Sequence, residues 1–130
     1  ALIDTASIKT DVLASIVGRE GFRLHNVNYV FVTDERLLDI NVEFLAHDTY
    51  TDVITFDLSD FDDVVEAEIY ISVERVAENA LNHQVDFMNE LLRVMIHGLL
   101  HLVGYDNRTD EAKADMRAKE NEYLVIYYIS

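Results

Sequence analysis

The chain has 130 residues, of which 50% are hydrophobic, no cysteine, and a formal net charge of -15. This composition excludes a disordered chain, disulfides and thiolate metal ligands. The length favours a single domain that spans residues 1–130. Because so acidic a chain repels nucleic acid and anionic membranes at long range, a nucleic-acid role needs a local basic surface or a docking partner.

The first half of the chain predicts two helices around a strand. Apolar spacing predicts a helix over residues 8–17, and alternating side chains predict a strand over residues 26–31. Thr33 or Asp34 suits the cap of a second helix that ends near Phe44. The apolar positions expected on this second helix are Leu37, Leu38, Val42, Phe44 and Leu45.

The second half of the chain predicts two more strands and three helices. The strands are expected over residues 53–58 and 67–73, and a short helix over residues 74–82. A long amphipathic helix is expected over residues 87–103, and Thr109 can cap a last helix that runs to Leu124. This order predicts an α+β fold, or α/β, with a small sheet covered by helices. Nothing at the start resembles a secretory leader, and no apolar run is long enough for a bilayer span, so we expect a cytoplasmic protein with no membrane partner.

The stretch from His97 to Asn107 is the most informative in the chain. His97 and His101 are four residues apart, so they lie on one face of a helix and are close enough to share a metal ion. Gly104 suits the left-handed residue that ends a helix, after which the chain can bring Asn107 towards the same ion. The alternative is a pair of core histidines with ordinary hydrogen bonds, but the combination with Gly104 and Asn107 favours a metal site.

Gly98 indicates the class of reaction. The spacing matches the metzincin zinc pattern, in which a glutamate at the position of Gly98 is the general base of peptide hydrolysis. A glycine there leaves that route without a base, and it also suggests space beside the ion for a large substrate such as a phosphodiester backbone. A metal ion can still activate water and stabilise charge on a phosphoryl oxygen. The motif therefore favours phosphoester chemistry over proteolysis.

The third metal ligand stays open. Asn107 is at the expected position, but a neutral amide oxygen is a poorer zinc ligand than imidazole or carboxylate. Asp106 or Asp110 is an alternative oxygen donor, and His83 and His47 are further candidates that are more typical of surface or core histidines. Spacing does not choose among them.

A cluster of basic residues follows the motif, but acids are interleaved with it. Such alternation is more typical of a solvated helix face than of an RNA-binding groove. The basic residues are Arg108, Lys113, Arg117 and Lys119.

Three blocks of the sequence, in order, resemble the YbeY family of bacterial endoribonucleases. Residues 41–56, NVEFLAHDTYTDVITF, are similar to the family's N-x-x-Y-R-x-x-D-x-P-T-D-V-L-S-F, and residues 67–72, AEIYIS, to its G-D-I-x-I-S. Residues 97–106 are similar to H-G-L-L-H-L-x-G-Y-D, and Met116 and Glu120 match the M-x-x-x-E of the family's last helix.

The resemblance implies a zincin-like α+β fold with a small mixed sheet, helices packed around it and a zinc site at the end of a central helix. It implies a single-strand-specific, metal-dependent endoribonuclease in small-subunit ribosomal RNA processing, with ribosomal RNA and the small ribosomal subunit as partners. His97 and His101 carry over as zinc ligands, and Asn107 takes the position of the third.

The chain departs from the family pattern at two further positions. Leu45 stands where the resemblance implies a catalytic arginine, and Tyr50 replaces a proline. We expect Leu45 to be a core residue, and Arg36, Arg75 and Arg93 are candidates to replace the arginine, which would neutralise phosphate charge in the transition state. Thr51 and Asp52 of the first block are expected to be structural, at the start of the strand.

Two alternative functions remain from the sequence. The departures at Leu45 and Asn107, with the acidic charge, suggest a ribosome-assembly factor with weak or no catalysis. The metzincin-like spacing alone suggests a metalloprotease, which Gly98 disfavours.

Overall fold

The computed structural model describes residues 5–47 and 49–130, so Asp48 of the first family-like block lies outside the described residues. None of the helices among these residues is both long and apolar enough to cross a membrane. The elements in chain order are η1 (Thr5–Ser7), α1 (Thr10–Arg19), β1 (Arg23–Val32), α2 (Asp34–Leu45), β2 (Val53–Asp57), β3 (Val64–Ser72), α3 (Val73–His83), α4 (Phe87–Leu102) and α5 (Asp110–Ile129).

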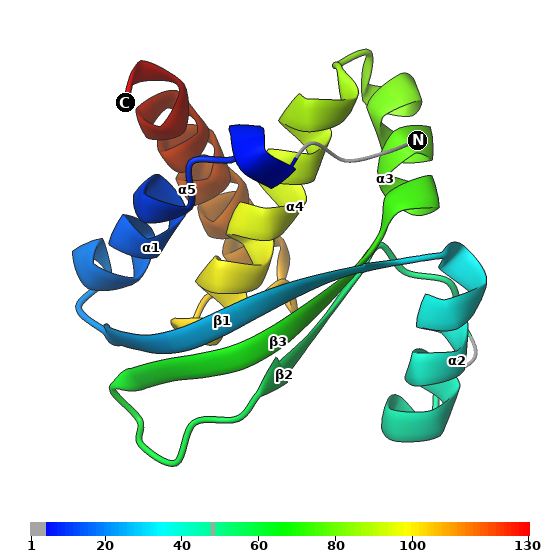
Figure 1. Ribbon diagram of the computed structural model, residues 1–130, viewed down its shortest axis with the longest axis horizontal. Helices are drawn as coiled ribbons and strands as arrows, with labels where there is room; N and C mark the ends of the chain where they lie inside the picture. Colours follow the sequence, from blue (N-terminus) through cyan, green and yellow to red (C-terminus); the bar gives the residue numbers. More distant parts are fainter. Residues whose placement is uncertain (1–4, 48) are drawn as a thin grey trace.

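The three strands form one mixed sheet in the order β1-β3-β2 (Figure 1). β1 runs parallel to β3, and β2 runs antiparallel to it. Both β1 and β3 begin three residues earlier than the alternation predicts. The backbone pairing already starts at Arg23 and Val64, before the alternating pattern begins. The predicted α+β class with a small mixed sheet is confirmed.

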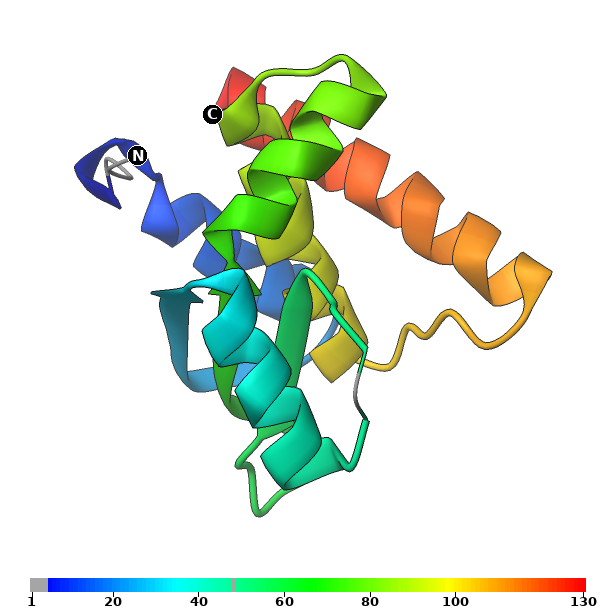
Figure 2. The same cartoon turned by 90° about the vertical axis from the view of Figure 1, so that its right-hand side faces the viewer.

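The sheet is covered on both faces. Along β3, buried residues alternate with half-buried ones, and the buried set packs into the main core with α1, α4 and α5. The opposite face packs on α2, where Leu37, Ile40 and Ile54 form a second, smaller core. Figures 1 and 2 show α2 apart from the other helices, across the sheet.

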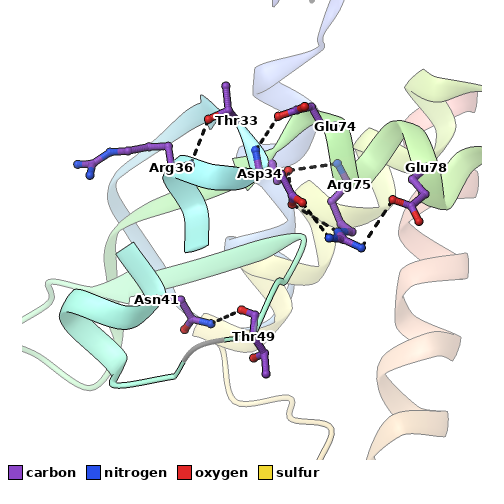
Figure 3. Close-up of polar contacts among 9 residues, drawn as sticks. Thr33, Asp34, Arg36, Asn41, Thr49, Glu74, Arg75 and Glu78 are labelled. Atoms are coloured by element: carbon purple, nitrogen blue, oxygen red, sulfur yellow. Dashed lines mark hydrogen bonds and ion pairs between the residues drawn. The ribbon is translucent and has the colours of Figure 1, made fainter. Parts of the chain in front are cut away.

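The N-terminal end of α2 is tied to α3 by polar contacts (Figure 3). Thr33 accepts a hydrogen bond from the Arg36 amide, which confirms the predicted cap. Arg75 lies 2.8 Å from the Asp34 carboxylate, and the Glu74 carboxylate accepts from the Asp34 amide. These contacts fix the start of α2 beside the C-terminal end of β3, from which α3 starts.

The C-terminal end of α2 corrects one prediction. Val42, Phe44 and Leu45 are 50%, 60% and 42% exposed, whereas Ile40 and Asn41 are buried. Leu45 is therefore not a core residue. The helix buries a narrower stripe than predicted because only its sheet-facing side meets an apolar surface.

Gly98 lies where α4 packs directly on the sheet. A Cβ atom at this position would lie 3.0 Å from Cδ1 of Ile69 and 3.4 Å from Cγ2 of Thr55. The glycine is buried and faces the strands, so the prediction that it leaves space for substrate is wrong. Its absent side chain lets α4 approach β3.

The end of α4 is as predicted. Gly104 has φ +108°, and the amides of Gly104 and Tyr105 donate to the carbonyl oxygens of His101 and Leu100. This is the Schellman arrangement, which a left-handed glycine allows at little cost. The chain then turns, and the Tyr105 hydroxyl donates to Glu20 at the end of α1 over 2.8 Å.

We predict that Gly98→Ala lowers the unfolding free energy by about 1 kcal/mol, because overpacking costs roughly 1–3 kcal/mol and the gain in helix propensity is only about 1 kcal/mol. The matched control is Gly18→Ala on α1, where a Cβ meets nothing within 4 Å. That control should gain up to about 1 kcal/mol in urea denaturation. In an Ile69→Val background, which removes the nearest atom, the cost of Gly98→Ala should shrink. Equal stabilisation by both alanines would contradict the close-contact role of Gly98.

Candidate functional site

A cavity of about 330 Å³ opens between α3, α4, α5 and the start of β2. Its lining is polar and carries both signs of charge. The lining residues are Asp52, Val53, Asn79, His83, Glu90, Arg93, Val94, His97, Asn107, Lys113, Met116, Arg117 and Glu120.

One face of α4 supplies the back of the cavity. Glu90, Arg93 and His97 follow each other at spacings of three and four residues, which stacks their side chains along one side of a helix. Other sides of the same helix are buried in the main core, where Leu92 and Ile96 are 2% and 0% exposed. The amphipathic pattern of α4 therefore fixes which residues reach the cavity.

Glu120 of α5 joins two of these side chains. Its Oε1 accepts from Nη1 of Arg93 at 2.9 Å, and its Oε2 lies 2.6 Å from Nδ1 of His97. Glu120 is only 5% exposed. Burial raises the pKa of its carboxyl, but hydrogen bonds from His97 and Arg93 outweigh burial, so the pKa lies below its ordinary value. The same hydrogen bond raises the pKa of His97.

The orientation of His97 suits a metal ligand. A carboxylate on one ring nitrogen is the usual outer partner of a zinc-binding histidine, because it fixes the ring and leaves the other nitrogen for the ion. Here Glu120 engages Nδ1, and Nε2 has no such partner among the described contacts. The side chain remains 29% exposed, so it is accessible from the cavity.

The other predicted ligands are only partly brought together. Asn107 lines the cavity with His97, whereas His101 is exposed one turn further along α4 and is not part of the lining. Oδ1 of Asp106 accepts a hydrogen bond from the backbone amide of Arg108. Within residues 5–47 and 49–130, no three histidine, cysteine, aspartate or glutamate side chains lie close enough to hold a metal ion. The third metal ligand therefore stays a prediction.

A second histidine–carboxylate pair lies on the other side of the cavity. His83, the last residue of α3, places Nδ1 3.1 Å from Oε1 of Glu90, and Glu90 is 4% exposed. Asn79, one turn earlier, reaches Oδ2 of Asp52 at 3.5 Å. Burial raises the pKa of Asp52, partly offset by His97. Asp52 therefore belongs to the cavity, beyond the structural role that its sequence suggested.

The cavity gathers three cations in a strongly acidic chain. Arg93 is the only one of the three candidate arginines that lines the part of the cavity described here, since Arg36 lies elsewhere and Arg75 is paired with Asp34. Lys113 and Arg117 join it from α5, where both side chains are exposed at the rim of the cavity, as expected of a solvated helix face. Leu45 is not among the lining residues.

Sequence reasoning missed the pairing of His83 with Glu90 and the bridge made by Glu120. The signal available was a carboxylate inside an apolar run, since Glu90 stands directly before Leu91 and Leu92. A buried carboxylate needs a partner, but the sequence does not name it.

Comparison with known proteins agrees on one family. The family model described as Endoribonuclease YbeY matches residues 4–127. The curated Endoribonuclease YbeY of Amoebophilus asiaticus is 45% identical over 118 residues, which are 91% of this chain and 80% of that protein. That of Flavobacterium johnsoniae is 39% identical over 127 residues, 98% of this chain and 91% of that protein. The solution structure of a Thermotoga maritima protein, 34% identical, matches with a TM-score of 0.66 over 95% of this chain and 83% of that one.

We predict that Glu120→Ala lowers the unfolding free energy by about 3 kcal/mol, because it leaves Arg93 without its buried partner. The matched control on the same helix is Glu122→Ala, whose carboxylate is 53% exposed and pairs with Lys119. That change should stay within about 0.5 kcal/mol of wild type in urea denaturation. Equal losses from the two variants would show that the bridge adds nothing to stability.

Proposed function

Because the chain belongs to the YbeY family of endoribonucleases, we propose that it is a metal-dependent, single-strand-specific endoribonuclease in small-subunit ribosomal RNA processing. The proposal includes zinc as the cofactor, ribosomal RNA and the small ribosomal subunit as partners, and the cytoplasm as location.

The observation that carries the proposal is the orientation of His97 by Glu120 in a cavity that also holds three cations. His97 and His101 are the proposed zinc ligands, with Asn107 as the third and Asp106 as the alternative. When bound, zinc would supply a Lewis acid that activates water and stabilises charge on phosphoryl oxygen.

The chain's own residues would bind and orient the RNA backbone. Glu120 holds both the ring of His97 and the guanidinium of Arg93, so neither needs to reorganise when substrate arrives. Arg93, Lys113 and Arg117 place positive charge where a phosphodiester would enter. A cavity of about 330 Å³ suits a nucleotide of an unpaired strand better than a duplex, which supports single-strand specificity.

The same lining disfavours a protease. The residue at the general-base position of a zinc protease is Gly98, which is buried against Ile69 and does not line the cavity. No glutamate therefore stands next to His97 in the position that peptide hydrolysis uses.

We predict that His97→Ala and His101→Ala each lower cleavage of single-stranded RNA by more than about 10²-fold and remove bound zinc, because each takes away a proposed ligand. The control is His25→Ala on β1, outside this cavity. Cleavage is followed on a labelled oligoribonucleotide, and zinc by plasma mass spectrometry. Unchanged cleavage by both variants would contradict the metal mechanism. Small-subunit binding that persists without cleavage in the wild type would favour the assembly-factor alternative.

A further inference from the structure

We propose that His83, oriented by Glu90, is a general acid of the cleavage reaction and protonates the ribose oxygen that leaves phosphorus. The inference rests on the proposed ribonuclease function and adds to it a catalytic residue outside the histidine motif. It starts from the second histidine–carboxylate pair of the cavity.

The position of His83 is suited to proton transfer. Its ring is held through Nδ1, 3.1 Å from the Glu90 carboxylate, while its side chain stays 49% exposed. A carboxylate that binds Nδ1 sets the orientation of an imidazole and leaves Nε2 to act on a substrate. His83 and His97 line the same cavity from different helices, α3 and α4.

The burial of Glu90 is hard to explain by packing alone. Its carboxylate is 4% exposed beside Leu91 and Leu92, which are 0% and 2% exposed. Such burial is costly without a partner, and His83 is the side chain that supplies it. A partner needed for stability alone gains nothing from a half-exposed ring that faces the cavity.

The surroundings of His83 come from α3, α4 and the start of β2. Asn79 lies one turn earlier on α3 and contacts Asp52, so this wall of the cavity carries Asp52, Asn79 and His83. The other charged groups that line the cavity are Glu90 and Arg93 of α4 and Lys113, Arg117 and Glu120 of α5. His97 and Asn107 line the same cavity from α4 and from the turn that follows it.

The step balances without any further reactant. Water forms the new bond to phosphorus and releases its proton to solvent, while the bond from phosphorus to the leaving ribose oxygen breaks and its electron pair stays on that oxygen. In the ionised ring both nitrogens carry hydrogen, so Nε2–H can donate to the leaving oxygen while Nδ1–H stays on Glu90. The neutral ring then regains a proton from solvent.

The test compares His83→Gln and Glu90→Gln with the control His25→Gln. We expect His83→Gln to lower kcat by about 10²–10³-fold, the range for a lost general acid, with KM within about twofold. Zinc content and far-ultraviolet circular dichroism should stay at wild-type values. Glu90→Gln keeps the size of the side chain and should lower kcat by about tenfold, because the ring is held less well.

A sulfur-substituted substrate isolates the proton. The leaving oxygen is identified from the wild-type products and replaced by sulfur in a synthetic oligoribonucleotide, because a thiolate leaves without protonation. His83→Gln should cleave this substrate within about threefold of wild type, since the general-acid contribution no longer applies. A deficit that persists on the sulfur substrate, a loss confined to KM, or a loss of zinc would each overturn the acid role.

Two further comparisons separate a folding failure of the variant, and a failure of the proposed function, from a failure of this inference. If His83→Gln does not fold, the double variant His83→Leu/Glu90→Leu removes the buried charge together with its partner, and it should fold yet keep the low kcat. A wild-type protein that cleaves no RNA contradicts the proposed function. A wild type that cleaves RNA no faster than His83→Gln contradicts this inference alone.

Discussion

The close approach of α4 to β3 at Gly98 is the constraint on which the rest of the molecule depends. With no Cβ between the helix and Ile69, α4 lies directly on the sheet, and α3 and α5 pack on its remaining sides. Glu90, Arg93 and His97 of α4 then line a cavity between three helices and the start of β2. One missing methyl group in the core thus determines where Arg93 and His97 stand.

Two buried carboxylates fix the orientation of two histidines that line this cavity. Glu90 of α4 contacts Nδ1 of His83 on α3. Glu120 of α5 contacts Nδ1 of His97 on α4. Because a buried carboxylate must be paired, the two rings have little freedom to turn away. The chain carries a net charge of -15, yet three of its ten lysine and arginine residues line this one cavity. The lining also carries Asp52, Glu90 and Glu120, so its cations and carboxylates are equal in number, and an anionic substrate meets less negative charge there than the overall charge predicts.

The sequence predicts the elements well where the signal is local. The Thr33 cap of α2 and the glycine stop of α4 depend on residues within one turn, and both are confirmed. The packing role of Gly98 is not visible in the sequence, because its neighbour, Ile69, lies in a distant strand. The exposure of Leu45 is not visible either, because an apolar residue at helical spacing does not reveal how wide a surface the helix covers. The pairing of His83 with Glu90 depends on how α3 meets α4, which no spacing within either helix reveals.

The topology of the sheet also bears on the order in which the molecule assembles. β3 takes the central position, but its parallel neighbour β1 is separated from it along the chain by α2 and β2. Pairing of β1 with β3 must close a long loop, whereas α3, α4 and α5 are consecutive and meet through short connections. We therefore expect the three helices to be able to bring both histidine–carboxylate pairs together early in folding. Asp52, at the start of β2, would then be added when the strands come into register, so the cavity would be the last part of the site to close.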